Sequence, residues 1–518
     1  MAIVETQEGK VEGCTEDGLY IFRGVPYAEP PVGPLRWRKP QPIQKKRPFT
    51  WDASVFRARP WQPELLAASV PPFSYLVDQS VQPCEEDCLY LNIYTNDLSK
   101  SDMPVMIWFH GGGFAYGSGS EQVYYGGHLA RKGVVLVTVN YRLGALGFMN
   151  LNEITNGQIP ASGNEGLFDQ LMAIDWVKEN VGRFGGSPDN ITVFGESAGA
   201  ISIGALLALE NSRGLFQRAI LQSGSALTAA PLSDCVNVAE GFVRHLGSRD
   251  PQFLMNTDPV QLMEITDLVS MEQGRMIFQP CIDGEVLPTL PITLIEQGAA
   301  DGFDVLAGTT KDESRLITHA FQADETAGLA AQTPQPLELL NATFPDANFD
   351  QIYTEYRVLL ENSVEQADDL SVYAAIETER SFRIPSIQLA EAFAHRGNTT
   401  YQYLFDWPCP ALGGKLGSCH IMDVGLVFGT YDDNKELVQF FGAGDEVEKL
   451  SSNMQDAWIS FARTGVPSCA PIGEWTPYST DLRCTTLLGS TIETVQAPMD
   501  DRRKLLAGAN QGVVLGWM

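Results

Sequence analysis

The segment that most constrains this chain is NITVFGESAGAIS, residues 190–202, in which one serine stands between two glycines. Ile191–Phe194 is a short apolar run typical of a buried strand, and the small apolar residues after Gly199 favour a helix. Glycine accepts the sharp turn that must join the two, because it has no side chain to obstruct the backbone. The segment therefore predicts a strand, a tight turn and a helix with Ser197 at the apex, the arrangement called a nucleophile elbow.

Strand and helix patterns alternate around this segment. Apolar runs predict strands at 104–110, 133–144, 218–225, 304–310 and 399–407, and apolar residues at helical spacing predict a helix within 166–186. Residues 1–100 have the short strand patterns of antiparallel hairpins, and residues 230–400 hold several helical patterns. We expect an α/β fold with a large, mostly parallel sheet, an antiparallel N-terminal part, flanking helices and helical excursions over the site. In such a sheet the site lies at the carboxyl ends of the strands.

The chain has 518 residues, and no Gly/Ser-rich, Pro-rich or charged linker divides it. We therefore expect one elaborated domain over 1–518, with 44% apolar residues to fill its core. The formal net charge of −29 repels phosphate backbones and anionic membranes, which disfavours nucleic-acid binding. Net charge alone does not distinguish a solubilising surface from a field that attracts cationic substrates.

Location is predicted from what the sequence lacks. The N-terminus MAIVETQEGKVEG has no basic start followed by an apolar run, and no stretch reaches the roughly 18 apolar residues of a membrane span. The nine cysteines are an odd number and mostly scattered, so we expect reduced thiols and a cytoplasmic protein. A secreted protein whose signal had been removed would look the same. Whether Cys84 and Cys88, four residues apart, are paired is left open.

A serine hydroxyl is a poor nucleophile unless a base takes its proton. In enzymes with a nucleophile elbow the chain order is serine, acid, histidine, so the base should follow Ser197. Of the six histidines, His420 lies in a glycine-rich loop after the last predicted strand, and we expect it to be the base. His395 ends a helical pattern, where a histidine is typical of a C-terminal cap.

The base needs an acid to orient it, and the oxyanion that forms needs N–H donors. Asp312 and Glu313 both follow the strand predicted at 304–310, and spacing alone does not choose between them. Gly111–Gly113 follow the strand predicted at 104–110 in an H-G-G-G pattern typical of esterases. Their amides, with that of Ala198 after the serine, are the expected oxyanion donors.

The chain resembles the type-B carboxylesterase/lipase family, which includes carboxylesterases, cholinesterases and p-nitrobenzyl esterases. The resemblance extends over most of the chain and rests on FRGVPYAEPPVGPLRW, EEDCLYLNIY, PVMIWFHGGGFAYGSG, VNYRLGALGF, GNEGLFDQLMAIDWVKENVGRFGGSPDNITVFGESAGA, LFQRAILQSGSA, QPCIDGEVLP, GTTKDES and GSCHIMDVGLVFG. It implies an α/β-hydrolase fold with a triad, an oxyanion hole and two residues that tune the triad. The residues that it implies are Ser197 as nucleophile, His420 as base, Glu313 as acid, Gly112, Gly113 and Ala198 in the oxyanion hole, and Glu196 and Ser223 near the triad.

Several positions depart from the family pattern. Ser314 stands where the family usually has glycine, and neither Cys88 nor Cys235 has a convincing disulfide partner, as in an intracellular or bacterial-type member. Bulky aromatics narrow the acyl pocket of cholinesterases, but Gly274 and Met276 stand at the corresponding positions before Phe278. The resemblance therefore implies an acyl pocket, formed by these residues, that accepts groups larger than acetyl.

The sequence as a whole predicts a serine carboxylesterase that acts on small to medium-sized esters through a Ser-His-Glu triad and an acyl-enzyme. The expected partner is a small-molecule ester, and no metal or organic cofactor is expected. The same triad also permits amide, carbamate or thioester hydrolysis, and a non-catalytic binding protein is a further alternative. The natural ester and the oligomeric state, monomer or dimer, do not follow from the sequence.

Overall fold

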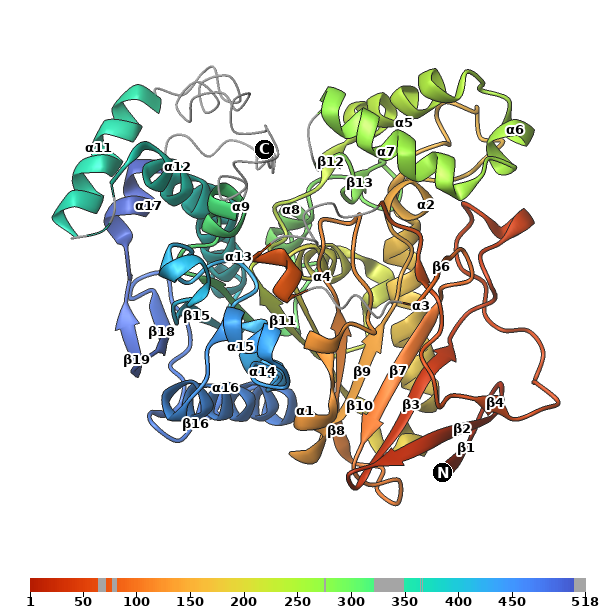
Figure 1. The fold of residues 1–518 in the computed structure, drawn as a ribbon, viewed down its shortest axis with the longest axis horizontal. Coiled ribbons are helices and arrows are strands. Elements are labelled where there is room, and N and C mark those ends of the chain that lie inside the picture. The colour runs from red at the N-terminus through yellow and green to blue at the C-terminus, as the bar shows by residue number, and fades with distance from the viewer. Residues whose placement is uncertain are drawn as a thin grey trace.

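The structure is a computed structural model that describes residues 1–63, 71–76, 82–273, 276–320, 349–363, 365 and 367–506. Its centre is a 13-stranded sheet in the order β1-β2-β3-β7-β9-β8-β10-β11-β14-β15-β18-β19, with β4 paired to β2 (Figure 1). The strands of this sheet are β1 (Ala2–Thr6), β2 (Gly9–Glu16), β3 (Leu19–Pro26), β4 (Trp51–Asp52), β7 (Tyr90–Thr95), β8 (Met103–Phe109), β9 (Val135–Val139), β10 (Gly186–Glu196), β11 (Arg218–Gln222), β14 (Asp304–Thr310), β15 (Thr400–Asp406), β18 (Cys484–Gly489) and β19 (Ile492–Gln496).

The pairing agrees with the predicted division of the sheet. Strands β1, β2, β3, β7 and β9 pair antiparallel in sequence order along the sheet. From β9 through β8, β10, β11, β14 and β15 to β18 every pair is parallel, and β19 closes the edge antiparallel. The α/β-hydrolase fold class predicted from the sequence is confirmed.

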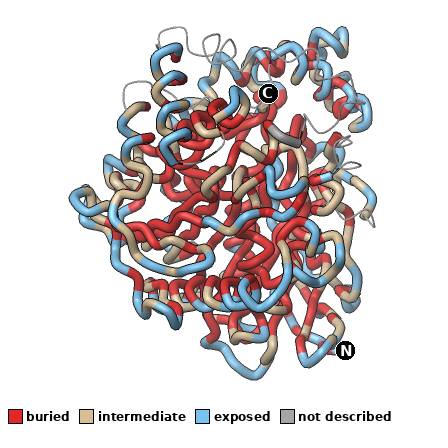
Figure 2. The backbone as a smooth tube through the Cα atoms, turned by 60° about the vertical axis from the view of Figure 1, so that its left-hand side comes forward, coloured by how far each residue is buried: buried red, intermediate tan, exposed pale blue. Residues whose placement is uncertain are grey.

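The central strands are buried on both faces, which explains their continuous apolar sequences. Every residue of β8 and β9 is buried. Alternate residues of β8 belong to the two cores: Val105, Ile107 and Phe109 pack on one face, and Met106 and Trp108 on the other. Figure 2 shows the buried backbone concentrated at the centre of the molecule.

Helices cover both faces of the sheet. Helices α3 and α4 contribute buried residues to one core, and α14 and α16 contribute to the other. The helices are α1 (Gly127–Arg131), α2 (Gly144–Phe148), α3 (Glu165–Asn180), α4 (Ala198–Ala208), α5 (Leu232–Leu246), α6 (Pro251–Met255), α7 (Pro259–Gln273), α8 (Pro291–Glu296), α9 (Arg315–Ala320), α11 (Phe349–Asn362), α12 (Asp369–Thr378), α13 (Ile384–His395), α14 (Val424–Phe428), α15 (Lys435–Phe441), α16 (Asp445–Thr464) and α17 (Asp500–Leu506).

The helical excursions expected from residues 230–400 form two groups. Helices α5, α6 and α7 lie together along one part of the upper edge in Figure 1, and α11 and α12 lie along another part. Buried residues of α5 and α7, among them Phe242 and Val269, belong to the same core as the sheet. That one domain spans the whole chain stays a prediction. Within the described ranges, none of the helices is both long and apolar enough to cross a membrane.

Candidate active site

The structure forms a strand, a sharp turn and a helix around Ser197, as the sequence predicts. Strand β10 ends at Glu196 and α4 begins at Ala198, which leaves Ser197 alone in the turn. Its backbone has a φ of 53° and a ψ of −123°, a sparsely populated conformation for a residue with a side chain. Two hydrogen bonds fix it: the Ser197 amide donates to the Gln222 carbonyl at 2.9 Å, and its carbonyl accepts from the Ile201 amide at 2.9 Å.

Glycine is required on either side of the turn, because the backbone of β8 approaches so closely that it leaves no room for a Cβ atom. A Cβ atom at Gly195 would lie 2.7 Å from the Phe109 carbonyl oxygen, and one at Gly199 would lie 2.0 Å from the same atom. The end of β8 therefore packs directly against the elbow. Ser197 itself is half-buried, whereas Glu196 and Ala198 are buried, so the turn presents the serine toward solvent.

The structure distinguishes the two acids that spacing left open. Nδ1 of His420 lies 2.6 Å from Oε2 of Glu313, and the His420 amide donates to the Glu313 carbonyl at 3.2 Å. Glu313 is completely buried, and its Oε1 accepts from the Thr310 amide at 2.8 Å. Both carboxylate oxygens are thus held, one by the strand end and one by the imidazole.

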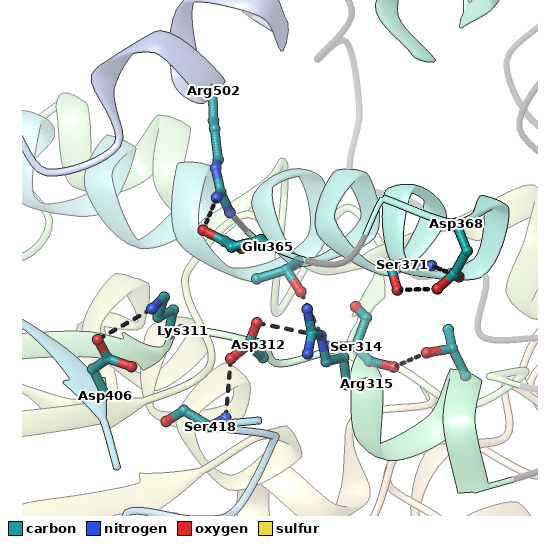
Figure 3. A network of polar contacts seen from close by, with 12 residues as sticks. Lys311, Asp312, Ser314, Arg315, Glu365, Asp368, Ser371, Asp406, Ser418 and Arg502 are labelled. Atoms are coloured by element: carbon teal, nitrogen blue, oxygen red, sulfur yellow. Dashed lines mark hydrogen bonds and ion pairs between the residues drawn. The ribbon is translucent and has the colours of Figure 1, made fainter. Parts of the chain in front are cut away.

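Asp312 has a different part in the same loop. Its Oδ2 accepts from the Ser418 amide at 3.0 Å, and its own amide donates to the Ser418 carbonyl at 2.8 Å (Figure 3). Oδ1 of Asp312 pairs with Nε of Arg315 at 3.3 Å. Asp312 therefore ties the loop that carries His420 to the loop that carries Glu313.

A second carboxylate faces the other ring nitrogen of His420. Nε2 lies 2.9 Å from Oε1 of Glu196, the residue before Ser197. This contact has the distance of an ion pair. Burial opposes charge on the imidazole, but Glu196 and Glu313 outweigh it and hold the pKa of His420 well above its usual range.

The glycine loop after β8 lies against the elbow. A Cβ at Gly111 would be 2.7 Å from Oε2 of Glu196 and 3.0 Å from Cβ of Ser197. Gly112 and Gly113 have φ values of 103° and 60°, the left-handed region that favours glycine.

The expected oxyanion donors have no competing partner in this arrangement. The Gly112 carbonyl accepts from the amides of Ala115 and Tyr116, at 3.1 and 2.9 Å, which directs it into the loop. Across the residues that the structure describes, the amides of Gly112, Gly113 and Ala198 donate no hydrogen bond. Three free N–H groups beside Ser197 have the chemistry of an oxyanion site.

A buried polar cluster lies beneath the elbow, and sequence reasoning found only part of it. Ser223 has a φ of 54°, and its Oγ is buried without a hydrogen-bond partner in the described ranges. Asp423 was missed. Its Oδ2 accepts from the Tyr403 hydroxyl at 2.6 Å and from Nε2 of Gln222 at 3.0 Å. Burial, helped by the charges of Glu196 and Glu313, raises the pKa of Asp423 to about 7. Its position three residues after His420 was the one available signal.

The expected acyl-pocket residues are only partly visible. Gly274 lies outside the described residues. Met276 is half-buried against the core, and Phe278 is fully packed, with its ring centroid 6.1 Å from that of Phe242.

The cysteines are all free thiols in the structure, including Cys84 and Cys88. Cys235, for which the sequence offered no partner, has its thiol in contact with that of Cys281. In the described ranges, no group of three or more His, Cys, Asp or Glu side chains is arranged to hold a metal ion.

The chain is similar to known proteins in both sequence and structure. The model of the carboxylesterase family matches residues 1–503. A para-nitrobenzyl esterase of Bacillus subtilis is 36% identical over 516 residues, which cover 97% of this chain and 98% of that protein. An acetylcholinesterase of Bungarus fasciatus is 32% identical over 92% of this chain and 81% of its own. A solved carboxylesterase of Geobacillus stearothermophilus superposes with a TM-score of 0.83 and 31% identity, over 97% of this chain and 99% of that one.

Proposed function

This chain belongs to the carboxylesterase family and hydrolyses carboxylic esters, and we propose that Ser197, His420 and Glu313 carry out the reaction. The observation that carries the assignment is the 2.6 Å contact between Nδ1 of His420 and Oε2 of Glu313. Together with the 2.9 Å contact of Nε2 to Glu196, it supports a base that lies between a fully buried acid and the elbow of Ser197. The roles of the three residues follow from this order.

In the proposed first half-reaction, Ser197 attacks the ester carbonyl while Nε2 of His420 takes the hydroxyl proton. Glu313 holds the proton on Nδ1, so the lone pair on Nε2 acts as the base once the ring is neutral, and Glu313 stabilises the imidazolium that forms. The tetrahedral oxyanion accepts hydrogen bonds from the amides of Gly112, Gly113 and Ala198. Each such donor contributes about 10²–10³ in rate in enzymes of this type.

The tetrahedral intermediate then collapses. His420 donates its proton to the leaving alcohol, the C–O bond breaks, and the acyl group stays on Ser197. Water enters, His420 takes a proton from it, and the resulting hydroxide attacks the acyl-enzyme. A second collapse returns the proton to Oγ of Ser197 and releases the carboxylic acid.

The proposed substrates are small to medium-sized esters with acyl groups larger than acetyl. The support is that Gly274 has no side chain and that the side chain of Met276 is flexible, where narrower pockets have aromatic residues. Phe278 packs on Phe242 and is proposed as a wall of the pocket and not an obstruction in it. Free thiols at all nine cysteines support a reducing, cytoplasmic location, and one domain over the chain remains our proposal for its organisation.

The test is initial rates on p-nitrophenyl esters from acetate to palmitate, with wild type, Ser197→Ala and Ser202→Ala side by side. Ser202 is a matched control, because it is a buried serine on α4 whose hydroxyl donates to the Ala198 carbonyl at 2.9 Å. We expect Ser197→Ala to lose about 10⁶ in kcat, and Ser202→Ala to keep its activity. Turnover that survives in Ser197→Ala would exclude this serine. A low rate on every ester, with serine-dependent turnover of amides, carbamates or thioesters, would assign the same triad to another bond.

A further inference from the structure

One helical layer over the acid loop contains a turn of unusual geometry. Helix α12 passes into a π-helical turn, η7 (Glu379–Arg383), which passes directly into α13. All five residues of the turn are buried. A π-helical turn is rare, since its hydrogen bonds run from residue i to i+5 and the turn is wider than that of an α-helix, and it occurs frequently at functional sites.

Side chains at the two ends of the turn hold the two flanks of Glu313. Oγ1 of Thr378 accepts from the Ser314 amide at 3.1 Å, on the carboxyl-terminal flank. Nη2 of Arg383 donates to the Lys311 carbonyl at 2.9 Å, on the amino-terminal flank. Glu313 therefore stands in a short segment whose backbone is anchored on both sides by this one turn.

The wide turn accounts for this double anchor. Residues five apart in an α-helix point about 140° away from each other, because successive residues rotate by about 100°. A turn closed by i to i+5 bonds brings positions five apart above one another, so Thr378 and Arg383 can reach the same loop. The Arg383 guanidinium is itself fixed by Glu379, whose Oε1 lies 3.0 Å from Nη1.

The same turn also contacts the imidazole. The ring of Phe382 lies 5.0 Å from the ring of His420, centroid to centroid, at an interplanar angle of 48°. Phe382 is 3% exposed, so its ring fills the space beside the imidazole and excludes water from it. The three contacts together hold the acid from both flanks and the base from one face.

We propose that the π-helical turn is the positioning device for the Glu313–His420 pair, with Thr378, Phe382 and Arg383 as positioning residues. The proposal rests on the proposed function, because it assigns the turn to the same triad. None of the three side chains is expected to touch substrate. Their effect is to keep the carboxylate and the imidazole in the geometry at which proton transfer is fast, where a displacement of about 1 Å can cost about 10²-fold in rate.

The experiment compares Thr378→Val with Thr378→Ser. Valine has the shape of threonine but leaves the buried Ser314 amide without its acceptor, whereas serine keeps the hydroxyl. We expect Thr378→Val to lower kcat per active site about tenfold with KM within about twofold of wild type, and Thr378→Ser to restore most of it. Phe382→Leu, which keeps an apolar side chain beside His420, should lower kcat in the same way.

Expressing kcat per titrated active site keeps a loss of protein stability from appearing as a loss of kcat. Active sites are titrated with a reagent that acylates the elbow serine, so unfolded protein does not enter kcat. Thr266→Val is the matched control, because Thr266 is a buried helical threonine on α7 whose hydroxyl donates to its own helix at 2.9 Å. It should keep wild-type kcat even if its melting temperature falls.

The outcomes separate the two proposals. If either Thr378→Val or Phe382→Leu keeps kcat per site within about twofold of wild type, or changes KM alone, the turn is a structural feature and the inference is overturned. Ser197→Ala, whose rate is expressed per mole of folded protein because it has no serine to titrate, tests the proposed function: activity that persists there removes the triad assignment, whatever the turn variants do. A variant that fails to fold is replaced by the other, since either one alone is decisive.

Discussion

Nδ1 of His420 lies 2.6 Å from Oε2 of Glu313, and the backbone amide of His420 donates to the Glu313 carbonyl at 3.2 Å. The side chain and the main chain of one residue are thus both bonded to the other. A hydrogen bond between an imidazole and a carboxylate is charge-assisted once the ring takes a proton, and it is stronger than a bond between neutral groups. Two loops far apart in the sequence, residues 311–314 and 408–423, therefore meet with little freedom.

The first prediction distinguishes the role of Glu313, the proposed acid of the triad, from that of Asp312 next to it. Glu313→Gln keeps the shape of the side chain but removes the charge that fixes the imidazole tautomer, and kcat should fall by about 10⁴, as in related triads. Asp312→Asn weakens the links to Ser418 and Arg315 but leaves the contact between Glu313 and His420 in place, so kcat should fall by less than about tenfold. The measurement is kcat on a p-nitrophenyl ester for both variants. A larger loss in Asp312→Asn than in Glu313→Gln would reverse the assignment.

The second prediction concerns pH. Because Glu196 and Glu313 hold the pKa of His420 above its usual range, the imidazole stays protonated to higher pH than a free histidine. The imidazole acts as a base only when it is neutral, so kcat/KM should rise with pH as His420 loses its proton. The midpoint of this rise, the acidic limb of the pH profile, should lie above about pH 6.5. Glu196→Gln removes one of the two charges and should move this rise in kcat/KM to lower pH.

The check is kcat/KM on an uncharged ester from about pH 5 to 9, a range that brackets imidazole titration. Arg244→Gln, a surface change on α5, serves as the control for altered net charge and should leave the limb in place. A limb that does not move in Glu196→Gln would show that the 2.9 Å contact has no electrostatic effect on the base.

How much the sequence could predict depends on whether a feature is local. The elbow at Ser197 and the strand patterns of β8, β9 and β10 are written in consecutive residues, so periodicity and glycine placement were enough. The antiparallel edge β18–β19 was not predicted, because β19 is only partly buried and neither strand has a clear apolar alternation.

Contacts between segments that are distant in the sequence could not be predicted from residue spacing. Asp312 and Glu313 could be separated only by the resemblance, because their neighbours on the His420 loop are about a hundred residues away in the sequence. Asp423 acquires its partners Tyr403 and Gln222 from two different strands. Nothing in ERSFR breaks a helix, and the one local signal for the π-helical turn at 379–383 is Pro385, which lacks the N–H for an α-helical bond to residue 381.

The third prediction tests how tightly the elbow is packed. Gly199→Ala would place a Cβ 2.0 Å from the Phe109 carbonyl oxygen, a backbone atom that cannot move aside without displacing β8. The free energy of unfolding should fall by about 3 kcal/mol, as for overpacked cores. Gly182→Ala is the matched control, because a Cβ there has no neighbour within 4 Å, and its effect should stay within about 0.5 kcal/mol. Urea unfolding of the two variants measures the difference, and equal midpoints would contradict the close approach.

The fourth prediction concerns the carboxyl group that sequence reasoning missed. The pKa of Asp423 is raised to about 7 by burial and by nearby carboxylates, so the folded protein binds a proton there that the unfolded chain releases near pH 4. A raised carboxyl pKa stabilises the fold less as pH rises, and the loss is complete once pH exceeds the folded value. With three pKa units between the two states, that loss is on the order of 4 kcal/mol.

Asp423→Asn should remove this pH dependence. Both hydrogen bonds to the side chain go to Oδ2, while Oδ1 has no partner in the described ranges, so the amide oxygen of asparagine can accept both bonds and its nitrogen can take the other place. Relative to wild type, the variant should therefore gain stability between pH 5 and pH 8, by up to about 3 kcal/mol. Urea unfolding at the two pH values gives this difference directly. A variant whose stability relative to wild type is the same at both pH values would mean that Asp423 is already ionised at pH 5 in the folded protein, which would contradict the raised pKa.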